Sequence, residues 1–129
     1  MNAPARVLIV DDDEDTLTLY SFALSASGLA VDRATTGAAA LAAARSRPPA
    51  VVVTDLMLPD VDGIQLCTAL RAAVGPGLLG LIVLSGTSDA EQRARARQAG
   101  ATDVLVKPCL PDDLERVIRR ALASAESGG

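Results

Sequence analysis

The sequence predicts an α/β fold in which a five-stranded parallel sheet is covered by helices on both faces. Short runs rich in valine, isoleucine and leucine recur five times along the 129 residues, and each is followed by a longer segment with helical periodicity. The runs of the first, third and fourth predicted strands are apolar throughout, as expected of strands buried on both faces. Half of the residues (50%) are hydrophobic, enough for one core without metal or disulfide cross-links. We therefore expect a single domain.

The predicted strands and helices alternate along the whole chain. The strands are residues 6–10, 30–34, 50–54, 79–84 and 103–106. The first helix, residues 15–27, ends before Gly28, a residue typical of helix C-termini. The second, residues 37–45, is rich in alanine, which has the highest helix propensity. The third contains Cys67, which we interpret as a small core residue.

The last two helices carry clear signals at their ends. Residues 88–98 begin with Ser88 and Glu91, which form a capping-box pair, and end before Gly100. Pro111 suits the first turn of the last helix. Apolar residues follow it at helical spacing, namely Leu114, Val117, Ile118, Ala121 and Leu122. This stripe is expected to dock the last helix on the sheet.

One domain is therefore expected over residues 1–129, with its folded core between about residues 5 and 123. Residues 124–129 are small and polar. They are expected to form a flexible tail or the beginning of a linker.

The composition argues against nucleic-acid binding and against membrane insertion. The net charge is −4 and the only aromatic residues are Tyr20 and Phe22, so the chain lacks both a basic surface and a base-stacking platform. The longest apolar runs are far shorter than a membrane span, and residues 1–5 lack the hydrophobic region of a signal peptide. We expect a cytoplasmic protein.

Metal sites built on cysteine or histidine are not indicated. Cys67 and Cys109 are the only cysteines, they form no CxxC motif, and the sequence has no histidine. Neither a zinc site nor a disulfide framework is predicted, and both thiols are expected to be free.

Polar residues that could bind a metal or take part in a reaction lie at the ends of four predicted strands. The first strand leads into Asp11 and Asp12, the third into Asp55, the fourth into Ser85 and the fifth into Lys107. Because ligands of open α/β sheets bind at the carboxyl ends of the strands, we expect these side chains to converge.

These residue types together favour phosphoryl transfer to a carboxylate. Two carboxylates 4 Å apart repel by about 4 kcal/mol at an effective dielectric constant near 20, so a cation should compensate them. A hard divalent ion such as Mg²⁺ suits oxygen ligands, and Lys107 supplies a fixed positive charge. A carboxylate in this setting can act as the nucleophile, and Ser85 can hydrogen-bond a phosphoryl oxygen.

Four segments that carry these residues resemble the receiver domains of bacterial two-component response regulators, including the chemotaxis regulators. The segments are VLIVDD (7–12), VVVTDLMLPDVDG (51–63), LIVLSG (81–86) and VKP (106–108). The resemblance covers nearly the whole chain and implies a flavodoxin-like sheet in the order 2-1-3-4-5 with five helices. It also implies a signalling switch that receives a phosphoryl group from a histidine kinase or a histidine phosphotransfer protein.

The resemblance assigns a role to each matching position. Asp55 is the expected phosphoacceptor, and Mg²⁺ is expected on Asp12, Asp55 and the backbone carbonyl of Met57, with Asp11 reaching it through water. Lys107 is expected to pair with the acceptor and to precede a cis peptide bond to Pro108, as is usual in similar domains. Ser85 takes the place of the switch hydroxyl.

Two positions depart from the family pattern. Val104 stands where relatives often have an aromatic switch residue, and Cys109 stands where many have phenylalanine. The phosphoryl chemistry does not depend on either position. The expected output surface consists of helix 88–98, strand 103–106 and the last helix. Without the aromatic switch residue, the sequence does not indicate how a signal would cross this surface.

Other polar residues have structural interpretations. Asp13 and Asp15 are expected to cap the first helix, and Asp60 and Asp62 to serve in turns and caps. Arginines 93, 95 and 97 are expected to form a solvated helix face rather than a docking patch.

Three other functions compete with the phosphorylated switch. A phosphatase of the haloacid dehalogenase type would need a second aspartate two residues after the nucleophile, where Met57 stands, so an enzyme with turnover is not expected. A degenerate receiver would act as an interaction module independent of phosphorylation. The chain could also be the receiver part of a longer DNA-binding or hybrid regulator.

Overall fold

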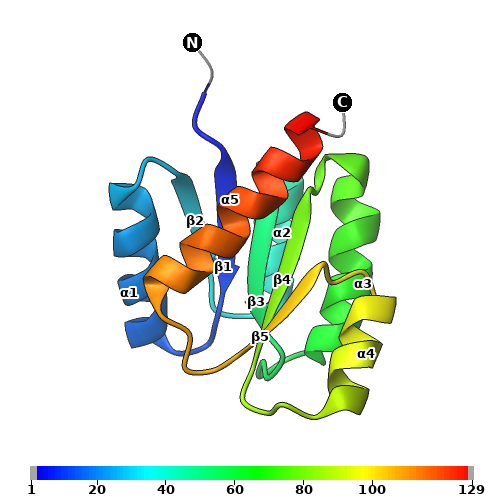
Figure 1. Cartoon of the computed structure of the whole chain (residues 1–129). Coiled ribbons are helices and arrows are strands. Elements are labelled where there is room, and N and C mark those ends of the chain that lie inside the picture. The colour runs from blue at the N-terminus through cyan, green and yellow to red at the C-terminus, as the bar shows by residue number, and fades with distance from the viewer. Residues whose placement is uncertain (1–2, 128–129) are drawn as a thin grey trace.

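The computed structural model, which describes the backbone of residues 3–127 and the side chains of residues 3–124, confirms the predicted fold class. Five parallel strands form one sheet in the flavodoxin-like order β2-β1-β3-β4-β5 (Figure 1). The strands are β1 (Arg6–Val10), β2 (Ala30–Ala34), β3 (Val51–Asp55), β4 (Gly80–Ser85) and β5 (Asp103–Val106). The helices are α1 (Glu14–Ala26), α2 (Gly37–Ser46), α3 (Gly63–Val74), α4 (Ala90–Gln98) and α5 (Pro111–Ser127), with a short 3-10 helix at Gly75–Gly77.

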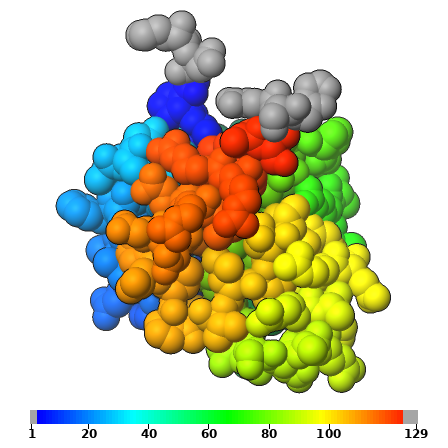
Figure 2. Space-filling model, in the orientation of Figure 1, coloured from blue at the N-terminus to red at the C-terminus, as the bar shows by residue number. Residues whose placement is uncertain are grey.

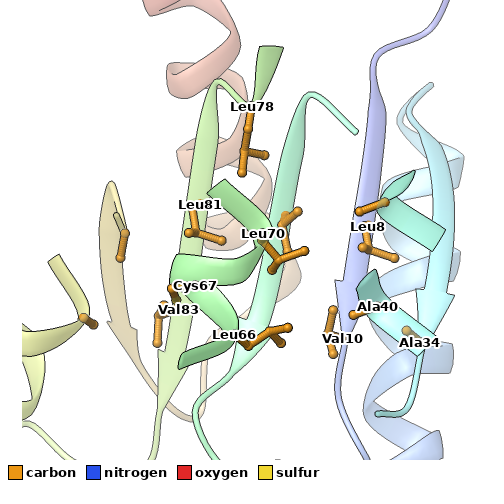
Figure 3. Close-up of a cluster of buried hydrophobic side chains, with 14 of the residues drawn as sticks. Leu8, Val10, Ala34, Ala40, Leu66, Cys67, Leu70, Leu78, Leu81 and Val83 are labelled. Atoms are coloured by element: carbon orange, nitrogen blue, oxygen red, sulfur yellow. The ribbon is translucent and has the colours of Figure 1, made fainter. Parts of the chain in front are cut away.

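The helices form a layer on each face of the sheet. α1 and α5 pack against each other on one face, and Figure 2 shows α5 in orange and red across the middle of that face, beside α1 in blue. α2, α3 and α4 cover the other face, where apolar side chains from the helices and strands interdigitate (Figure 3). Every residue of β3 and β4 is buried, in agreement with the uninterrupted apolar runs of the sequence.

The third and fourth strands lie one residue further along the chain than the predicted ranges 50–54 and 79–84. Asp55 is the last residue of β3 and Ser85 the last residue of β4. Asp55 pairs in register with Leu84 of the neighbouring strand. Because these polar residues belong to the hydrogen-bonded ladder, the sheet itself fixes the direction of their side chains.

Asp89 caps α4, so the predicted capping box that begins at Ser88 was wrong. The Asp89 carboxylate accepts a hydrogen bond from the Glu91 amide (2.9 Å). The amide of Asp89 donates to the hydroxyl of Thr87 (3.1 Å), and the backbone at Asp89 is non-helical (φ −56°, ψ 121°), as an N-cap requires. The predicted C-terminal signal was correct, because Gly100 follows α4 with a positive φ of 116°.

α5 begins at Pro111 as predicted but continues through Ser127, so residues 124–127 of the predicted tail are helical. Small and polar residues alone do not end a helix, and the first glycines after Pro111 are Gly128 and Gly129, which lie outside the described residues. The apolar stripe docks as expected, with Leu114, Val117 and Ile118 buried. Within residues 3–127, no helix is long and apolar enough to cross a membrane.

Cys67 is a core residue of α3, as predicted. It is completely buried among the side chains of the cluster drawn in Figure 3. Burial raises the pKa of its thiol to about 11, so the thiol is protonated and unreactive at neutral pH. Cys109 is partly buried, and both cysteines are free thiols.

Candidate functional site

The polar residues at four strand ends converge at the carboxyl edge of the sheet. Asp11 and Asp12 follow β1, Asp55 ends β3, Ser85 ends β4 and Lys107 follows β5, and these four strands are consecutive neighbours in the sheet. One carboxylate oxygen from each of the three aspartates lies within 4.8 Å of the others. Asp11, Asp55 and Ser85 are buried, whereas Asp12 is exposed. The pocket therefore has a fixed inner part and an open rim.

Lys107 connects two of the carboxylates. Its ammonium nitrogen Nζ lies 2.8 Å from Asp55 Oδ2 and 3.3 Å from Asp11 Oδ2. Its backbone amide donates to the carbonyl of Ser85 (2.7 Å), and the peptide bond from Lys107 to Pro108 is cis, as the family resemblance implies. The lysine is thus held at both its backbone and its side-chain end.

Burial and ion pairing act in opposite directions on the charges of the pocket. Burial raises the pKa of Asp11 above its ordinary value, although the amide of Asp13 and the ammonium of Lys107 act to lower it. Burial by itself would lower the pKa of Lys107, but the hydrogen bond to Asp55 and the nearby negative charges outweigh it, so this pKa is raised. Lys107 is therefore charged at neutral pH.

The carboxylate of Asp55 and the hydroxyl of Ser85 each receive a backbone hydrogen bond. Asp55 Oδ1 accepts from the amide of Met57 (3.1 Å), and its other oxygen accepts from Lys107. Ser85 Oγ accepts from the amide of Thr87 (3.2 Å). A hydroxyl that accepts in this way still has its own proton to donate. Ser85 is therefore equipped to donate to an oxygen added near Asp55.

A hollow of about 580 Å³ opens beside Ser85, between the β3–α3 loop and the β4–α4 loop. Its walls are Leu56, Met57, Leu58, Pro59, Asp60, Val61, Asp62, Ser85, Gly86, Thr87 and Gln92. Of the strand-end residues, Ser85 lines the hollow, together with Leu56 and Met57 from the loop that follows Asp55. It is called the edge hollow below.

The three carboxylates suit a hard divalent cation. They face one ammonium, which leaves two negative charges uncompensated by ion pairs among the described side chains. The donors are carboxylate oxygens, the ligands that Mg²⁺ prefers. Asp11, Asp12 and Asp55 therefore fit Mg²⁺. The side chain of Met57 is exposed, and its backbone carbonyl remains a predicted ligand.

The two departures from the family pattern are both accommodated by packing. Val104 is buried, with 8% of its surface exposed, and belongs to the core on the side of α2, α3 and α4. Cys109 packs against the opposite core, and its carbonyl accepts a hydrogen bond from the Tyr20 hydroxyl (2.6 Å). Sequence reasoning missed this contact, because the two residues are 89 positions apart and carry no local signal.

Of the four aspartates predicted to serve in caps and turns, Asp13, Asp60 and Asp62 accept hydrogen bonds from helix amides, and Asp60 acts across the molecule. Asp13 caps α1 and Asp62 caps α3, and Asp15 lies in the first turn of α1. Asp60 accepts hydrogen bonds from the first amides of α2, more than twenty residues earlier in the chain. The sequence indicated the capping role of Asp60 but not which helix it would cap.

The arginines of α4 agree with a solvated helix face. Among the described side chains, none of Arg93, Arg95 and Arg97 forms an ion pair, and the guanidinium of Arg97 donates to the carbonyl of Thr102 (3.0 Å).

A flavodoxin-like sheet with three aspartates, a hydroxyl and a lysine at its carboxyl edge defines the class of receiver domains. The family model described as "Response regulator receiver domain" matches residues 7–119, and the chain belongs to this family.

Individual relatives support the assignment. The chain is 39% identical over 124 residues to the transcriptional regulatory protein KdpE of Mycobacterium tuberculosis (strain CDC 1551 / Oshkosh), a match that covers 93% of this chain and 54% of KdpE. It is 31% identical over 121 residues to the alkaline phosphatase synthesis transcriptional regulatory protein PhoP of Bacillus subtilis (strain 168), covering 94% of this chain and 50% of PhoP. The chain thus spans about half the length of these curated relatives.

Among solved structures, a CheY-like receiver domain protein from Methanospirillum hungatei JF-1 superposes with a TM-score of 0.91 at 30% identity, covering 98% of this chain and 99% of that one. The chemotaxis response regulator CheY4 of Vibrio cholerae superposes with a TM-score of 0.85 at 29% identity, covering 92% and 98%.

Proposed function

We propose that this domain is a phosphorylation-dependent switch in which Asp55 accepts a phosphoryl group from the phosphohistidine of a histidine kinase or a histidine phosphotransfer protein in the cytoplasm. The observation that carries the proposal is the lysine bridge, in which Lys107 Nζ contacts both Asp55 (2.8 Å) and Asp11 (3.3 Å) within a cluster of three carboxylates. A carboxylate held between cations is the arrangement that phosphoryl acceptance needs.

The proposed reaction replaces one bond to phosphorus by another. A carboxylate oxygen of Asp55 forms the new P–O bond while the P–N bond to the donor imidazole breaks. The electron pair of that bond remains on the imidazole nitrogen, which then takes a proton from solvent. The product is an aspartyl phosphate, an acyl phosphate that water can hydrolyse to reset the switch.

The residues around Asp55 have separate parts in this reaction. The ammonium of Lys107 neutralises charge on the phosphoryl oxygens, and the hydroxyl of Ser85 donates a hydrogen bond to one of them. When bound by Asp12, Asp55 and the carbonyl of Met57, with Asp11 reaching it through water, Mg²⁺ would supply the remaining positive charge at these oxygens. A phosphatase of the haloacid dehalogenase type would need an acidic residue where Met57 stands, so no catalytic turnover is proposed.

The proposed output surface consists of α4, β5 and α5. Movement of Ser85 and Lys107 toward a phosphoryl group would carry with it the loops that follow β4 and β5. Phosphorylation then shifts the population toward a conformation in which this surface binds a downstream protein. The relatives KdpE and PhoP are transcriptional regulators of about twice this length, so a longer regulator that contains this domain is part of the proposal.

Labelling with a small acyl phosphate tests the acceptor. In the presence of Mg²⁺ and acetyl phosphate, intact-mass measurement should show one phosphoryl group per chain, lost on alkaline treatment. Asp55→Asn should show none. The matched control Asp13→Asn removes an exposed cap carboxylate of α1 and should be labelled like the wild type. Equal labelling of Asp55→Asn and the wild type would contradict the assignment.

A phosphorylation-independent interaction module is the second candidate, and the buried Val104 favours it. A valine has no ring that could swing between an inner and an outer position. Amide hydrogen exchange with and without beryllofluoride, a phosphoryl mimic, separates the two functions. Altered exchange in α4 and β5 supports the switch, whereas unaltered exchange supports the module.

A further inference from the structure

We propose that Asp60 is a positioning residue, which holds the β3–α3 loop, and with it the backbone of Met57, against the first turn of α2. The inference rests on the proposed function, because it concerns the divalent-cation site of the same switch. Asp60 lies outside the cluster of Asp11, Asp12 and Asp55, and it would act on that cluster through the backbone of Met57.

Asp60 forms the hydrogen bonds that join its loop to α2. Its Oδ1 accepts from the amide of Gly37 (2.8 Å) and its Oδ2 from the amide of Ala38 (3.0 Å), so both oxygens grip the first turn of α2. These two bonds lower the pKa of Asp60, because they favour the charged form of the carboxylate. The contact is therefore fully formed at neutral pH.

The packing around this contact is close. A Cβ atom added to Gly37 would lie 2.2 Å from Cγ1 of Val61, the residue after Asp60. A glycine at the start of α2 thus lets the loop approach the helix so nearly that both carboxylate oxygens reach its amides. The lack of a side chain at Gly37 and the two hydrogen bonds of Asp60 therefore belong to one close contact between the loop and α2.

The end of β2, separated from α2 by two residues, contacts the carboxylate segment that follows β1. The backbone amide of Asp11 donates to the carbonyl of Ala34 (3.1 Å), at the end of β2. Asp11 and the β3–α3 loop are therefore attached to the same short segment, residues 34–38. Through this segment, Asp60 sets the separation between the carboxylates after β1 and the backbone of Met57.

Among the described residues, the other contacts of the loop lie at its ends, within the loop, or in apolar packing, and none of them joins it by a hydrogen bond to α2. The bonds from the Met57 amide to Asp55 and from the Gly63 amide to the carbonyl of Leu56 (3.1 Å) lie at the ends of the loop. The backbone of Met57 also forms an isolated bridge with that of Asp62, and Leu58 and Val61 pack against the core on the side of α2, α3 and α4. Without Asp60, the loop would lose its hydrogen bonds to α2, and apolar packing alone would oppose movement of its middle away from the carboxylates.

Calorimetric titration of the intact domain with Mg²⁺ alone tests the proposal. For Asp60→Ala we expect the dissociation constant of Mg²⁺ to rise about tenfold, the usual effect of losing a residue that orients a ligand. Asp60→Asn keeps one acceptor oxygen, so it should give an intermediate value. Circular dichroism and urea unfolding in EDTA report separately on the metal-free fold.

Two control variants separate positioning from loss of charge and from loss of a helix cap. Thr36 is the residue directly before α2, and its hydroxyl accepts from the amide of Ala39. Thr36→Ala removes this local cap and leaves the contact between Asp60 and α2 in place. Asp62→Ala removes an exposed carboxylate from the same loop and the cap of α3. Both should bind Mg²⁺ within about twofold of the wild type, since a single exposed charge is screened by salt.

The outcomes distinguish the inference from the function on which it rests. If Asp60→Ala and Thr36→Ala weaken Mg²⁺ binding equally, or if Asp60→Ala binds like the wild type, the positioning role is wrong while the switch stands. If Asp60→Ala does not fold, Asp60→Asn decides, and wild-type affinity in that variant overturns the inference. If the wild type neither binds Mg²⁺ nor becomes phosphorylated, the proposed function itself fails.

Discussion

The two sides of the edge hollow are held in opposite ways. On one side, the β3–α3 loop is tied to α2 by Asp60, and α3 behind it buries Leu66, Cys67 and Leu70. On the other side, the β4–α4 loop is held by bonds between near neighbours in the sequence, and Ala96 is the buried residue of α4. A side that depends on long-range packing is rigid, whereas one that depends on local bonds can open at low cost.

This difference places the more weakly held side where the proposed switch needs movement. Ser85 lies at the start of the β4–α4 loop, and its hydroxyl accepts from Thr87. The Thr87 hydroxyl accepts from the amide of Asp89, which caps α4. A change at Ser85 therefore passes along consecutive bonds to the first turn of α4, while the opposite wall keeps the carboxylates in place.

The largest expected effect is on the rigid side. Leu70→Ala removes a completely buried side chain of α3, and the free energy of unfolding should fall by about 2–5 kcal/mol because a cavity remains. Urea denaturation followed by circular dichroism measures this loss. A loss below about 1 kcal/mol, the range of surface substitutions, would mean that α3 is not the firmly packed wall.

The next effect concerns the contact that attaches α4 to α3. The guanidinium of Arg71 donates to the carbonyls of Gly100 (3.0 and 2.9 Å) and Leu78 (2.6 Å). Arg71→Ala should cost about 1–3 kcal/mol, since these partly buried carbonyls lose their partner, and amide exchange in α4 should accelerate. The control Arg95→Ala removes an exposed arginine of α4 and should leave stability unchanged; an equal loss in both variants would contradict the special role of Arg71.

Glycine substitutions at two exposed alanines, one in each helix, compare the local opening of α4 and α3. Ala94→Gly in α4 and Ala72→Gly in α3 each lower helix propensity by about 1 kcal/mol. If α4 opens locally, Ala94→Gly should speed the exchange of α4 amides by about fivefold with the remaining amides unchanged. Ala72→Gly should show no such local effect, because α3 is expected to open only with the whole domain. Equal local effects would remove the distinction between the two sides.

The smallest effect is the pH dependence of the contact between Asp60 and α2. The amides of Gly37 and Ala38 lower the pKa of Asp60 below its ordinary value of 3.8. The contribution to stability is therefore complete above pH 4 and disappears as the pH falls through the lowered pKa. Urea unfolding between pH 6 and about pH 2.5 should show that wild type and Asp60→Asn converge in acid; a constant difference would contradict this.

Sequence patterns predicted the order of the strands and helices and most of their bounds. They could do so because buried parallel strands are continuous apolar runs and because helix ends carry caps and glycines. They placed Asp55 and Ser85 just outside their strands, since polar residues favour loops, whereas the ladder continues through both. They favoured Ser88 over Asp89 as the cap of α4, whereas in the structure the Asp89 carboxylate accepts the capping hydrogen bond from the Glu91 amide.

The sequence by itself determined which residues form the proposed phosphoacceptor pocket. Parallel strands that each end in a polar residue must bring these residues to one edge, so Asp11, Asp12, Asp55, Ser85 and Lys107 could be grouped without a structure. Only the tertiary structure decided what surrounds the pocket. The contacts of Asp60 with α2, of Arg71 with Gly100 and of Tyr20 with Cys109 join residues 22 to 89 positions apart. Such contacts depend on how helices and loops pack, and local patterns carry no record of that.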